Sequence, residues 1–369
     1  MSKKRGPIDF PLFITILILL SIGVVMVFSA SMVEDYKIYN DTYYHLKKQI
    51  LWAFLGIFAM MFMANFDYRK LRNKKILVFG MLITIALLII VLFMPARKGA
   101  TRWIGIGGAS IQPSELAKMM LIIYLSDNIV RKGEKIKSFT KGVLPVLIIA
   151  SFFALLIILE PNMSTTVIIM AVAFSLLFVG GAKIQQLAGI VLLGVAVAAV
   201  GIIIEPYRMR RLTGFIDPFK DPLDTGYQAI QSLYALGSGG LFGMGLGQSR
   251  QKWHYIPEAQ NDFIFSIICE ELGYIGALFV IILFVVLVWR GLKIAVTSRD
   301  KFGTLVAAGI TSLMAVQSSI NFLVVASFMP VTGVPLPLIS YGGSSLVFTM
   351  ALLGILLNIS RYTVKNGVE

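Results

Sequence analysis

Charged residues and cysteine are both scarce in this 369-residue chain. Asp, Glu, Lys and Arg make up 14% of the residues, hydrophobic residues make up 57%, and the mean hydropathy is +0.83. This is more apolar surface than a water-soluble core can hide. Because Cys269 is the only cysteine, an intrachain disulfide and a cluster of thiolate metal ligands are excluded. The sequence therefore predicts a polytopic membrane protein.

Acidic residues are fewer than basic ones. The chain has 19 Asp and Glu against 33 Lys and Arg, which gives a formal net charge of +14. Nucleic-acid binding needs basic residues gathered on one folded polar surface. Here they are spread through short segments between apolar runs, so we expect no nucleic acid as a partner.

The apolar runs have the length of membrane-crossing helices. A hydrocarbon layer about 30 Å thick needs about 20 helical residues, whereas a barrel strand shows about ten alternating ones. The sequence predicts an all-α polytopic membrane protein, a single domain over residues 1–369, with a long extracytoplasmic loop at about 205–262 between helices 7 and 8. The ten expected transmembrane helices lie at about 10–30, 46–65, 76–95, 113–130, 142–159, 163–180, 187–205, 263–289, 304–328 and 341–360.

The distribution of Lys and Arg between these helices predicts the orientation. Ten crossings put both termini on one side, where the loops carry 20 basic residues against 12 on the other. Long loops orient membrane proteins weakly, and without residues 205–262 the contrast is 20 against 6. We expect a multi-pass protein of the cytoplasmic (inner) membrane with both termini cytoplasmic. The polar loop, and the chemistry it carries, are then extracytoplasmic.

Asp262 stands where the long polar loop meets the apolar run that begins at Phe263. An ionisable group at membrane depth costs several kcal/mol unless it is paired or useful, so Asp262 is a candidate functional residue. Asp is also a favoured N-cap of a helix. Position alone leaves the two interpretations about equal.

A second group of candidates lies at residues 100–118. Pro113 suits the first turn of a helix, and Glu115 and Lys118 share one helix face, where they can neutralise each other. An ion pair that only holds helices together is an equal alternative. Arg102 beside Trp103 suits either a phosphate or an anchor at the lipid headgroups. The substrate-binding candidates of this segment are Arg102, Gln112, Ser114, Glu115 and Lys118.

The long loop carries a third group. Arg208, Arg210 and Arg211 place three guanidinium groups beside the membrane, where they suit bidentate contact with phosphate or pyrophosphate. Residues 227–236 have apolar side chains at helical spacing and predict a short helix in the interface. Six glycines follow between residues 237 and 247. With Arg250 and Lys252 they are candidates for holding an anionic headgroup, and a plain glycine-rich connector is an equal alternative.

Two segments at membrane depth are unusual. Glu270 and Glu271 lie within the expected eighth span, so we expect cations or backbone donors of other helices to meet them. Residues 329–345 are broken by proline and glycine, and non-helical backbone at this depth is tolerated only where protein or a water-filled cavity covers it. We expect an outward-facing cavity there, with three substrate-binding candidates: Ser340, Tyr341 and Ser344.

Four sets of residues are specific in combination, although each alone would be weak. They are Arg102-Trp103-Ile104-Gly105 with Gln112-Pro113-Ser114-Glu115, Gly240-Leu241-Phe242-Gly243 with Gly245-Leu246-Gly247, Pro257-Glu258 with Asp262-Phe263-Ile264-Phe265 and Glu270-Glu271-Leu272-Gly273, and Pro330-Val331-Thr332-Gly333 with Ser340-Tyr341-Gly342-Gly343-Ser344-Ser345. Together they resemble the SEDS family of cell-wall polymerases, the FtsW, RodA and SpoVE group, along nearly the whole chain. Residues 247–252 and 357–362 are most similar to the division and sporulation branch (FtsW and SpoVE) of Gram-positive bacteria.

The resemblance implies a peptidoglycan glycosyltransferase that polymerises lipid II into glycan strands on the outer leaflet. It also implies a class B penicillin-binding protein as partner, which crosslinks the glycan, together with other division or sporulation membrane proteins. The family's essential aspartate falls on Asp262. Two positions depart from the family pattern, because Lys48 stands where Arg is common and Asn162 stands where Asp is common.

The implied reaction gives these residues roles. Asp262 is expected to take the proton from the acceptor sugar's 4-hydroxyl as that oxygen attacks the anomeric carbon with inversion. Lys48, Arg102 and the arginines at 208, 210 and 211 are candidates for contact with the departing pyrophosphate. No ligand cluster for a resident metal is predicted. The one cofactor considered is a divalent cation, Mg²⁺ or Mn²⁺, at the pyrophosphate, in place of or beside these basic groups.

Two other classes of protein fit parts of the pattern. A lipid II flippase would use the intramembrane charges to line its path. It predicts translocation by the isolated protein without new glycan. A membrane scaffold that only recruits the transpeptidase predicts that cells with Asp262→Asn divide normally.

Overall fold

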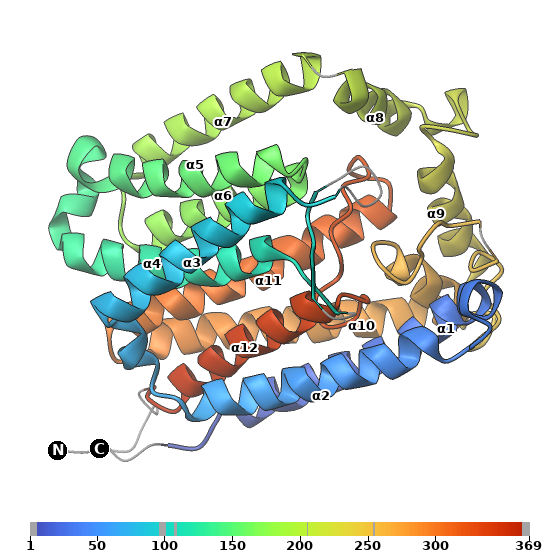
Figure 1. The fold of residues 1–369 in the computed structure, drawn as a ribbon, viewed down its shortest axis with the longest axis horizontal. Coiled ribbons are helices and arrows are strands. Elements are labelled where there is room, and N and C mark those ends of the chain that lie inside the picture. The colour runs from blue at the N-terminus through green and yellow to red at the C-terminus, as the bar shows by residue number, and fades with distance from the viewer. Residues whose placement is uncertain (1–5, 96–100, 107–108, 205, 254, 364–369) are drawn as a thin grey trace.

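The computed structural model describes residues 6–95, 101–106, 109–204, 206–253 and 255–363. Helices dominate the described part, and most of them run side by side in one elongated bundle (Figure 1). The α-helices are α1 (Phe10–Tyr39), α2 (Tyr44–Asn65), α3 (Lys74–Leu92), α4 (Pro113–Lys132), α5 (Leu144–Leu159), α6 (Met163–Val179), α7 (Ile184–Ile204), α8 (Pro206–Ile216), α9 (Tyr227–Ser238), α10 (Ile264–Thr297), α11 (Lys301–Val325) and α12 (Gly343–Ser360). Short turns of other helical types are η1 (Tyr68–Arg72), η2 (Gly133–Lys137), η3 (Phe139–Val143) and η4 (Pro218–Lys220).

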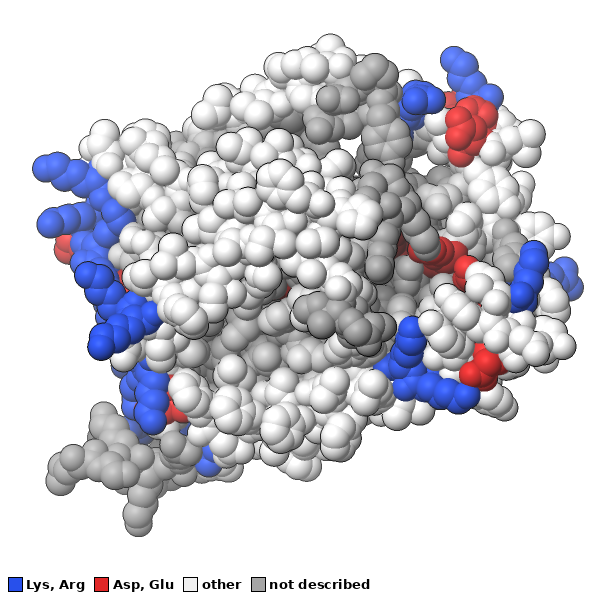
Figure 2. Space-filling model, in the orientation of Figure 1, with Lys and Arg blue, Asp and Glu red and all other residues white. Residues whose placement is uncertain are grey.

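Eight of the described helices are long and apolar enough to cross a membrane. They are α1, α2, α3, the run Phe139–Leu159 that contains α5, α7, α10, α11 and α12. On the face drawn in Figure 2, uncharged side chains cover the middle of the molecule, while Lys and Arg gather at the end where the termini lie. An apolar band between charged ends is the pattern of a chain embedded in a bilayer. The prediction of a polytopic all-α membrane protein is therefore confirmed.

Helices α4 and α6 occupy the two remaining ranges that were expected to be spans. α6 is apolar and has 17 residues, which is at the short end of the length needed to cross a membrane. α4 has 20 residues and carries Glu115 and Lys118 near its start. The ion pair they form lowers the mean hydropathy of the helix without preventing its burial within the protein.

Three local features extend or correct the helical prediction. Strands β1 (Ile104–Ile106) and β2 (Ala109–Ile111) form an antiparallel hairpin in register Ile104 to Ile111, although the sequence predicted helices throughout. The alternating isoleucines of β1 suit a strand. The loop 205–262 contains α8, which was not predicted, and α9, which confirms the short helix expected at 227–236.

Polar side chains start several helices. The Asp9 carboxylate accepts a hydrogen bond from the Leu12 backbone N–H at 3.0 Å, and the Asp300 carboxylate accepts one from Gly303 at 2.9 Å. Such caps satisfy backbone donors that have no partner within the helix. Asp9 also accepts a hydrogen bond from the Arg290 Nε at 3.0 Å, so the start of α1 is tied to α10.

Close packing of α2 against α12 depends on small residues. The two helices lie side by side along most of their length (Figure 1). A side chain at Gly354 would collide with the backbone of Met60, and one at Gly56 would press on Met350. Glycine at such positions lets two membrane helices approach closely, which maximises van der Waals contact where lipid supplies no hydrophobic driving force.

Helix α10 is broken at Gly273, which has φ 67° and ψ −169°. The glycine-rich segment after α9 packs against this break: Met244 N–H donates to the Glu270 carbonyl at 2.9 Å, and Tyr274 N–H donates to the Gly240 carbonyl at 2.9 Å. Gly243 also has positive φ, and its place leaves no room for a Cβ. These glycines therefore serve backbone packing on α10, in keeping with the connector interpretation.

We expect Gly273→Ala to destabilise the protein by about 2 kcal/mol or more, since an L side chain at this φ is strained and the added Cβ collides with Gly243. Gly189→Ala in α7 is the matched control, because nothing lies within 4 Å of its Cβ position. Thermal unfolding of the detergent-solubilised proteins measures both effects. Equal melting temperatures for the two variants would contradict the role of the break.

Candidate functional site

A cavity of about 490 Å³ lies where several helices begin. Its wall contains Gln112 and Asn162, which precede α4 and α6, Asp262, which precedes α10, and Gly343, the first residue of α12. The start of a helix carries partial positive charge and unpaired N–H groups, so the cavity is suited to an anion. Of the residues predicted from the sequence, the cavity brings together Lys48, Arg102, Gln112, Glu115, Lys118, Asp262 and Tyr341.

Asp262 lies in the turn before α10 and is half-buried. It does not cap that helix, because α10 begins at Ile264 with Phe263 as N-cap and no side-chain capping bond. The backbone is held firmly, since Asn321 Nδ2 donates to the Asp262 carbonyl at 2.8 Å and to the Val334 carbonyl at 2.8 Å. A Cβ at Gly333 would lie 3.2 Å from the Asp262 carboxylate, so this glycine leaves the carboxylate its space. Asp262 is therefore not the N-cap of α10, and its functional role stays a prediction.

Glu115 and Lys118 form a buried ion pair on the cavity wall. Lys118 Nζ lies 2.8 Å from Glu115 Oε1, and the side chains are 3% and 6% exposed. Each charge compensates the other at a depth where one alone would be costly. Because both residues line the cavity, the pair can serve structure and substrate together.

Lys48 and Tyr341 line the cavity and belong to an aromatic cluster around the connection between α1 and α2. Lys48 Nζ donates to the Tyr44 hydroxyl at 2.6 Å and lies 4.1 Å from the centre of that ring. Tyr341 packs edge-on against His45, with 4.6 Å between ring centres. Burial raises the pKa of Tyr341 to about 12, so its hydroxyl stays a neutral donor.

The His45 ring is itself fixed by a carboxylate that the sequence did not single out. His45 N–H donates to Asp35 Oδ2 at 2.9 Å, its Nδ1 contacts Asp35 Oδ1, and Asp35 is fully buried. The sequence pattern did not predict this contact, because Asp35 lies in α1 and His45 in α2, and the packing of the two helices brings them together. His45 was identifiable only as one of the two histidines of the chain.

Arg102 connects the hairpin to the turn between α5 and α6. Its Nε donates to the Glu160 carbonyl at 3.2 Å, and its Nη2 contacts the Pro161 carbonyl. The Glu160 carboxyl is fully buried and has no hydrogen-bond partner among the described residues. Burial raises the pKa of Glu160 to about 8, although the positive charge of Arg102 opposes this shift.

Several predicted residues lie outside the cavity but support its walls. Ser344 Oγ accepts a hydrogen bond from Gln112 N–H at 3.1 Å, and Ser340 Oγ accepts one from Leu336 N–H at 2.8 Å. Ser114 is fully buried. Arg211, in α8, donates from Nη1 to the Val331 carbonyl at 2.9 Å and so contacts the segment that forms one wall. The Ser340 and Ser344 hydroxyls hold backbone in place, whereas the Ser114 hydroxyl has no hydrogen-bond partner among the described residues.

The remaining basic candidates are not among the described residues that line the cavity with Asp262. Lys252 is buried, with Nζ 3.3 Å from Glu271 Oε1, and the Arg250 side chain is exposed. Arg210 is exposed on α8, and the side chain of Arg208 lies outside what the structure describes. Lys252 meets the expectation that a cation from elsewhere neutralises the acidic pair in α10.

The described part of the chain holds no group of three or more His, Cys, Asp or Glu side chains placed to bind a metal ion. The described residues lining the cavity contribute three carboxylates, from Glu115, Glu258 and Asp262, and three cations, from Lys48, Arg102 and Lys118. Oxygen donors of this kind suit Mg²⁺ or Mn²⁺, which commonly take one or two protein carboxylates together with phosphate oxygens.

The sequence of this chain is similar to those of known proteins along nearly its whole length. The family model for FtsW, RodA and SpoVE, described as cell cycle proteins, matches residues 10–365. The chain belongs to this family. The stage V sporulation protein E of Bacillus subtilis (strain 168) is 45% identical over 367 residues, which cover 98% of this chain and 99% of that protein. A probable peptidoglycan glycosyltransferase FtsW of Geobacter sp. (strain M18) is 39% identical over 364 residues, 98% of each.

Solved structures show the same fold. One match is a chain of a peptidoglycan synthase complex, from a structure described as "Structural coordination of polymerization and crosslinking by a peptidoglycan synthase complex". It has a TM-score of 0.77 and 24% identity, and the match covers 96% of this chain and 98% of that one. The rod shape determining protein RodA of Thermus thermophilus has a TM-score of 0.68 and 24% identity, with 97% and 98% covered. The FtsW, RodA and SpoVE fold therefore extends over nearly the whole chain.

We expect Glu160→Gln to stabilise the protein increasingly as the pH rises from about 5 to 8, with no further gain above pH 8. The folded state keeps the Glu160 proton up to a pKa of about 8, whereas the unfolded chain loses it near 4.5, so rising pH through this window favours unfolding. The neutral amide removes this cost, and the melting temperature should exceed that of the unaltered protein by about 2–4 °C per kcal/mol recovered. Exposed Glu134→Gln is the control and should show no such rise between about pH 5 and 8. A constant difference across the pH range would contradict a protonated Glu160.

Proposed function

We propose that this chain is a peptidoglycan glycosyltransferase that polymerises lipid II at the outer face of the cytoplasmic membrane, in division or sporulation. The observation that carries the proposal is the cavity in which Asp262 meets Lys48, Arg102 and the starts of four helices. Relatives named as probable peptidoglycan glycosyltransferases, 38–39% identical over most of their length, support the reaction class.

Asp262 acts as the general base. Its carboxylate takes the proton of the acceptor sugar's 4-hydroxyl while that oxygen bonds to the anomeric carbon of the donor. The bond from that carbon to the pyrophosphate oxygen breaks, and attack from the opposite side inverts the configuration. The half-buried position of Asp262 suits this role, because the carboxylate can meet substrate without full exposure to water.

The departing pyrophosphate needs stabilisation of negative charge as the bond breaks. Lys48, Arg102 and Lys118 line the same cavity as Asp262, and helix starts add backbone N–H groups. Donors that are held in place before reaction stabilise developing charge most effectively. Tyr341, which lines the same cavity, adds a hydroxyl donor. The three residues Arg208, Arg210 and Arg211 on or near α8 are proposed to guide the anionic headgroup toward the cavity.

A divalent cation, Mg²⁺ or Mn²⁺, fits the oxygen donors present. Glu258 is the lining carboxylate that would hold it together with the pyrophosphate oxygens, because Asp262 serves as the base and Glu115 is paired with Lys118. When bound, it would neutralise charge on the leaving group. The protein's own cations contribute to the same end.

We propose that a class B penicillin-binding protein is the partner that crosslinks the product. The likeness of fold to a chain of a peptidoglycan synthase complex supports this assembly. Other division or sporulation membrane proteins are proposed as further partners, since the sporulation protein of B. subtilis is 45% identical.

We further propose ten crossings, with α4 and α6 among them, and both termini in the cytoplasm. Lys and Arg gather at the end of the molecule that carries the termini (Figure 2). Basic residues near the membrane favour the cytoplasmic side. The cavity then faces outward, where lipid-linked precursors are consumed.

Asp262→Asn should lower the rate of glycan formation from purified lipid II by about 10² to 10⁴, because the amide cannot accept the proton. The measurement resolves labelled product by gel after incubation with protein in detergent or liposomes. Asp224→Asn, an exposed carboxylate between α8 and α9, is the control and should retain full activity. An unchanged rate with Asp262→Asn would remove the carboxylate from the mechanism.

The flippase alternative gives the opposite outcome in the same material. Liposomes with the unaltered protein would then move lipid II between leaflets while no glycan forms. Polymer made by the purified protein, with its partner present or absent, excludes a function limited to transport.

For the orientation, we expect a cysteine in place of Tyr43 to react with a membrane-impermeant maleimide in spheroplasts, in a Cys269→Ser background. Tyr43 lies between α1 and α2 and is 53% exposed. A cysteine in place of Lys137, whose side chain is 57% exposed between α4 and α5, should react only after permeabilisation. The reverse pattern of labelling would invert the proposed topology.

A further inference from the structure

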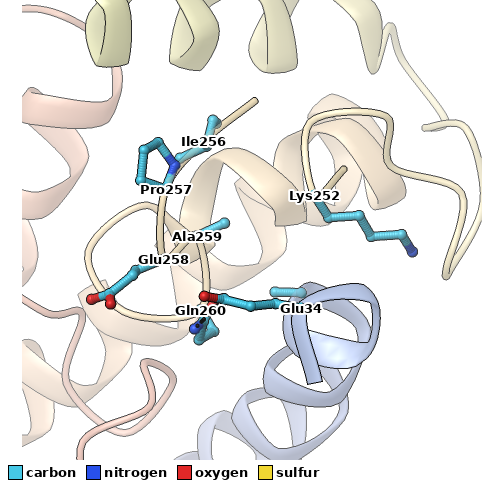
Figure 3. A pocket seen from close by; sticks show the side chains of 8 residues that line it. Glu34, Lys252, Ile256, Pro257, Glu258, Ala259 and Gln260 are labelled. Atoms are coloured by element: carbon cyan, nitrogen blue, oxygen red, sulfur yellow. Dashed lines mark hydrogen bonds between the residues drawn. The ribbon is translucent and has the colours of Figure 1, made fainter. Parts of the chain in front are cut away.

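A second cavity, of about 300 Å³, lies beside the outer end of α1 (Figure 3). Ala30 and Glu34 of α1 form one wall, and residues of the segment between α9 and α10 form the other. A volume of this size is at the lower end of the range for small-molecule sites, enough for one ring-sized group. The functions assigned so far do not use this space.

Glu258 joins the two cavities, because it lines both. Its backbone has φ 50°, a left-handed conformation that is unusual for a residue with a side chain. Its carboxylate accepts a hydrogen bond from Asn261 Nδ2 at 3.0 Å. Asp262 follows four residues later, so one short segment carries the wall of the second cavity and the proposed base of the first. Strained backbone of this kind tends to persist where function requires it.

The lining of the second cavity is unsuited to pyrophosphate. Lys252 is its only cation among the described lining residues, and its Nζ is buried against Glu271, at 3.3 Å. Figure 3 shows the Lys252 and Glu258 side chains extending in opposite directions from the loop. Glu34 reaches from α1 to Gln260, whose Nε2 donates to Glu34 Oε2 at 3.0 Å.

The same lining suits an uncharged group rich in hydroxyls. The Glu34 carboxylate has lone pairs beyond the one used by Gln260, and carboxylates accept hydrogen bonds from hydroxyl groups. Ile256 and Pro257 provide apolar surface beside it. A sugar ring combines hydroxyls at its edge with apolar C–H faces, which matches this mixture of carboxylate, amide and apolar wall.

We propose that the second cavity binds a sugar ring of the growing glycan, adjacent to the ring that reacts at Asp262. This inference rests on the proposed glycan polymerisation. A polymerase that adds many units benefits from a hold on its product beyond the reacting residue, because each transfer otherwise leaves the strand free to dissociate. The pyrophosphate end occupies the cavity with Lys48 and Arg102, and the sugar backbone of the strand extends past Glu258 to Glu34.

The test compares glycan length with the rate of the first linkage. Glu34→Ala should shorten the average strand about tenfold, since loss of a hydrogen bond to a charged group weakens binding by about one order of magnitude. The joining of two lipid II molecules, followed as the first tetrasaccharide, should change less than about twofold. Glu34→Gln keeps an acceptor oxygen and should recover part of the length.

Asp41→Asn is the matched control, because Asp41 is an outer carboxylate of the α1–α2 connection that lines neither cavity. It should leave strand length unchanged. Ala30→Leu fills the second cavity from the α1 side while the Glu34 carboxylate is kept, and it should also shorten the strands. A soluble β-1,4-linked N-acetylglucosamine tetramer should inhibit elongation by the unaltered protein more strongly than it inhibits the first linkage.

The outcomes separate this inference from the proposed function. If the unaltered protein joins no lipid II, the glycosyltransferase proposal fails. If it polymerises and both Glu34→Ala and Ala30→Leu give strands of unaltered length, only the sugar subsite is overturned. Equal loss of first linkage and elongation in both variants would also overturn it, because the cavity would then serve the reacting ring or the fold. Equal inhibition of both steps by the tetramer counts against it in the same way, even if the variants do not fold.

Discussion

Two buried carboxylates in α10, Glu270 and Glu271, hold the segment between α9 and α10, on which the position of Asp262 depends. Glu270 accepts hydrogen bonds from the backbone N–H groups of Arg250 and Gln251 at 3.0 and 3.3 Å, and Glu271 accepts one from Ser249 at 3.2 Å. Acids at this depth are costly alone, and here the loop that they anchor supplies their donors. The segment that follows this anchor leads directly into Asp262, so the position of the proposed base is set two helical turns deeper in the protein.

Lys252 and Ser29 complete this arrangement from two directions. Lys252 Nζ lies 3.3 Å from Glu271, and Ser29 Oγ, in α1, donates to the same carboxylate at 2.7 Å. The contacts of Glu271 therefore join α1, α10 and the segment between α9 and α10. Because α1 also forms one wall of the second cavity, both cavities share a single support. A disturbance of Glu271 should reach each of them.

The sequence was sufficient for the fold class and most of the cavity wall. Apolar runs of helical length located the spans, and prolines and glycines at 329–345 indicated an outward cavity, which Tyr341 and its neighbours line. The pair Glu115 and Lys118 was predictable because its partners are three residues apart on one helix. Such contacts follow from local periodicity alone.

Contacts between distant segments were beyond this reasoning. The pairing of Asp35 with His45 joins two helices, and the pairing of Lys252 with Glu271 depends on how a glycine-rich loop folds back on α10. For the same reason the sequence grouped Arg250 and Lys252 with the anion-binding candidates, although Lys252 is committed to an internal carboxylate. A charge can be located from the sequence, but its partner is fixed by the packing of helices.

The electrostatic balance of the main cavity explains why an amide suits position 162. The three cations and three carboxylates on the described lining offset each other, so the remaining attraction for an anion comes from the starts of α4, α6, α10 and α12. Asn162 accepts a hydrogen bond from Thr165 N–H at 3.3 Å and so caps α6 without adding charge. An aspartate there would cap equally well, but it would make the lining net negative and place a second acid near buried Glu160. With the amide, the charged groups of the described lining carry no net negative charge that would oppose an anion.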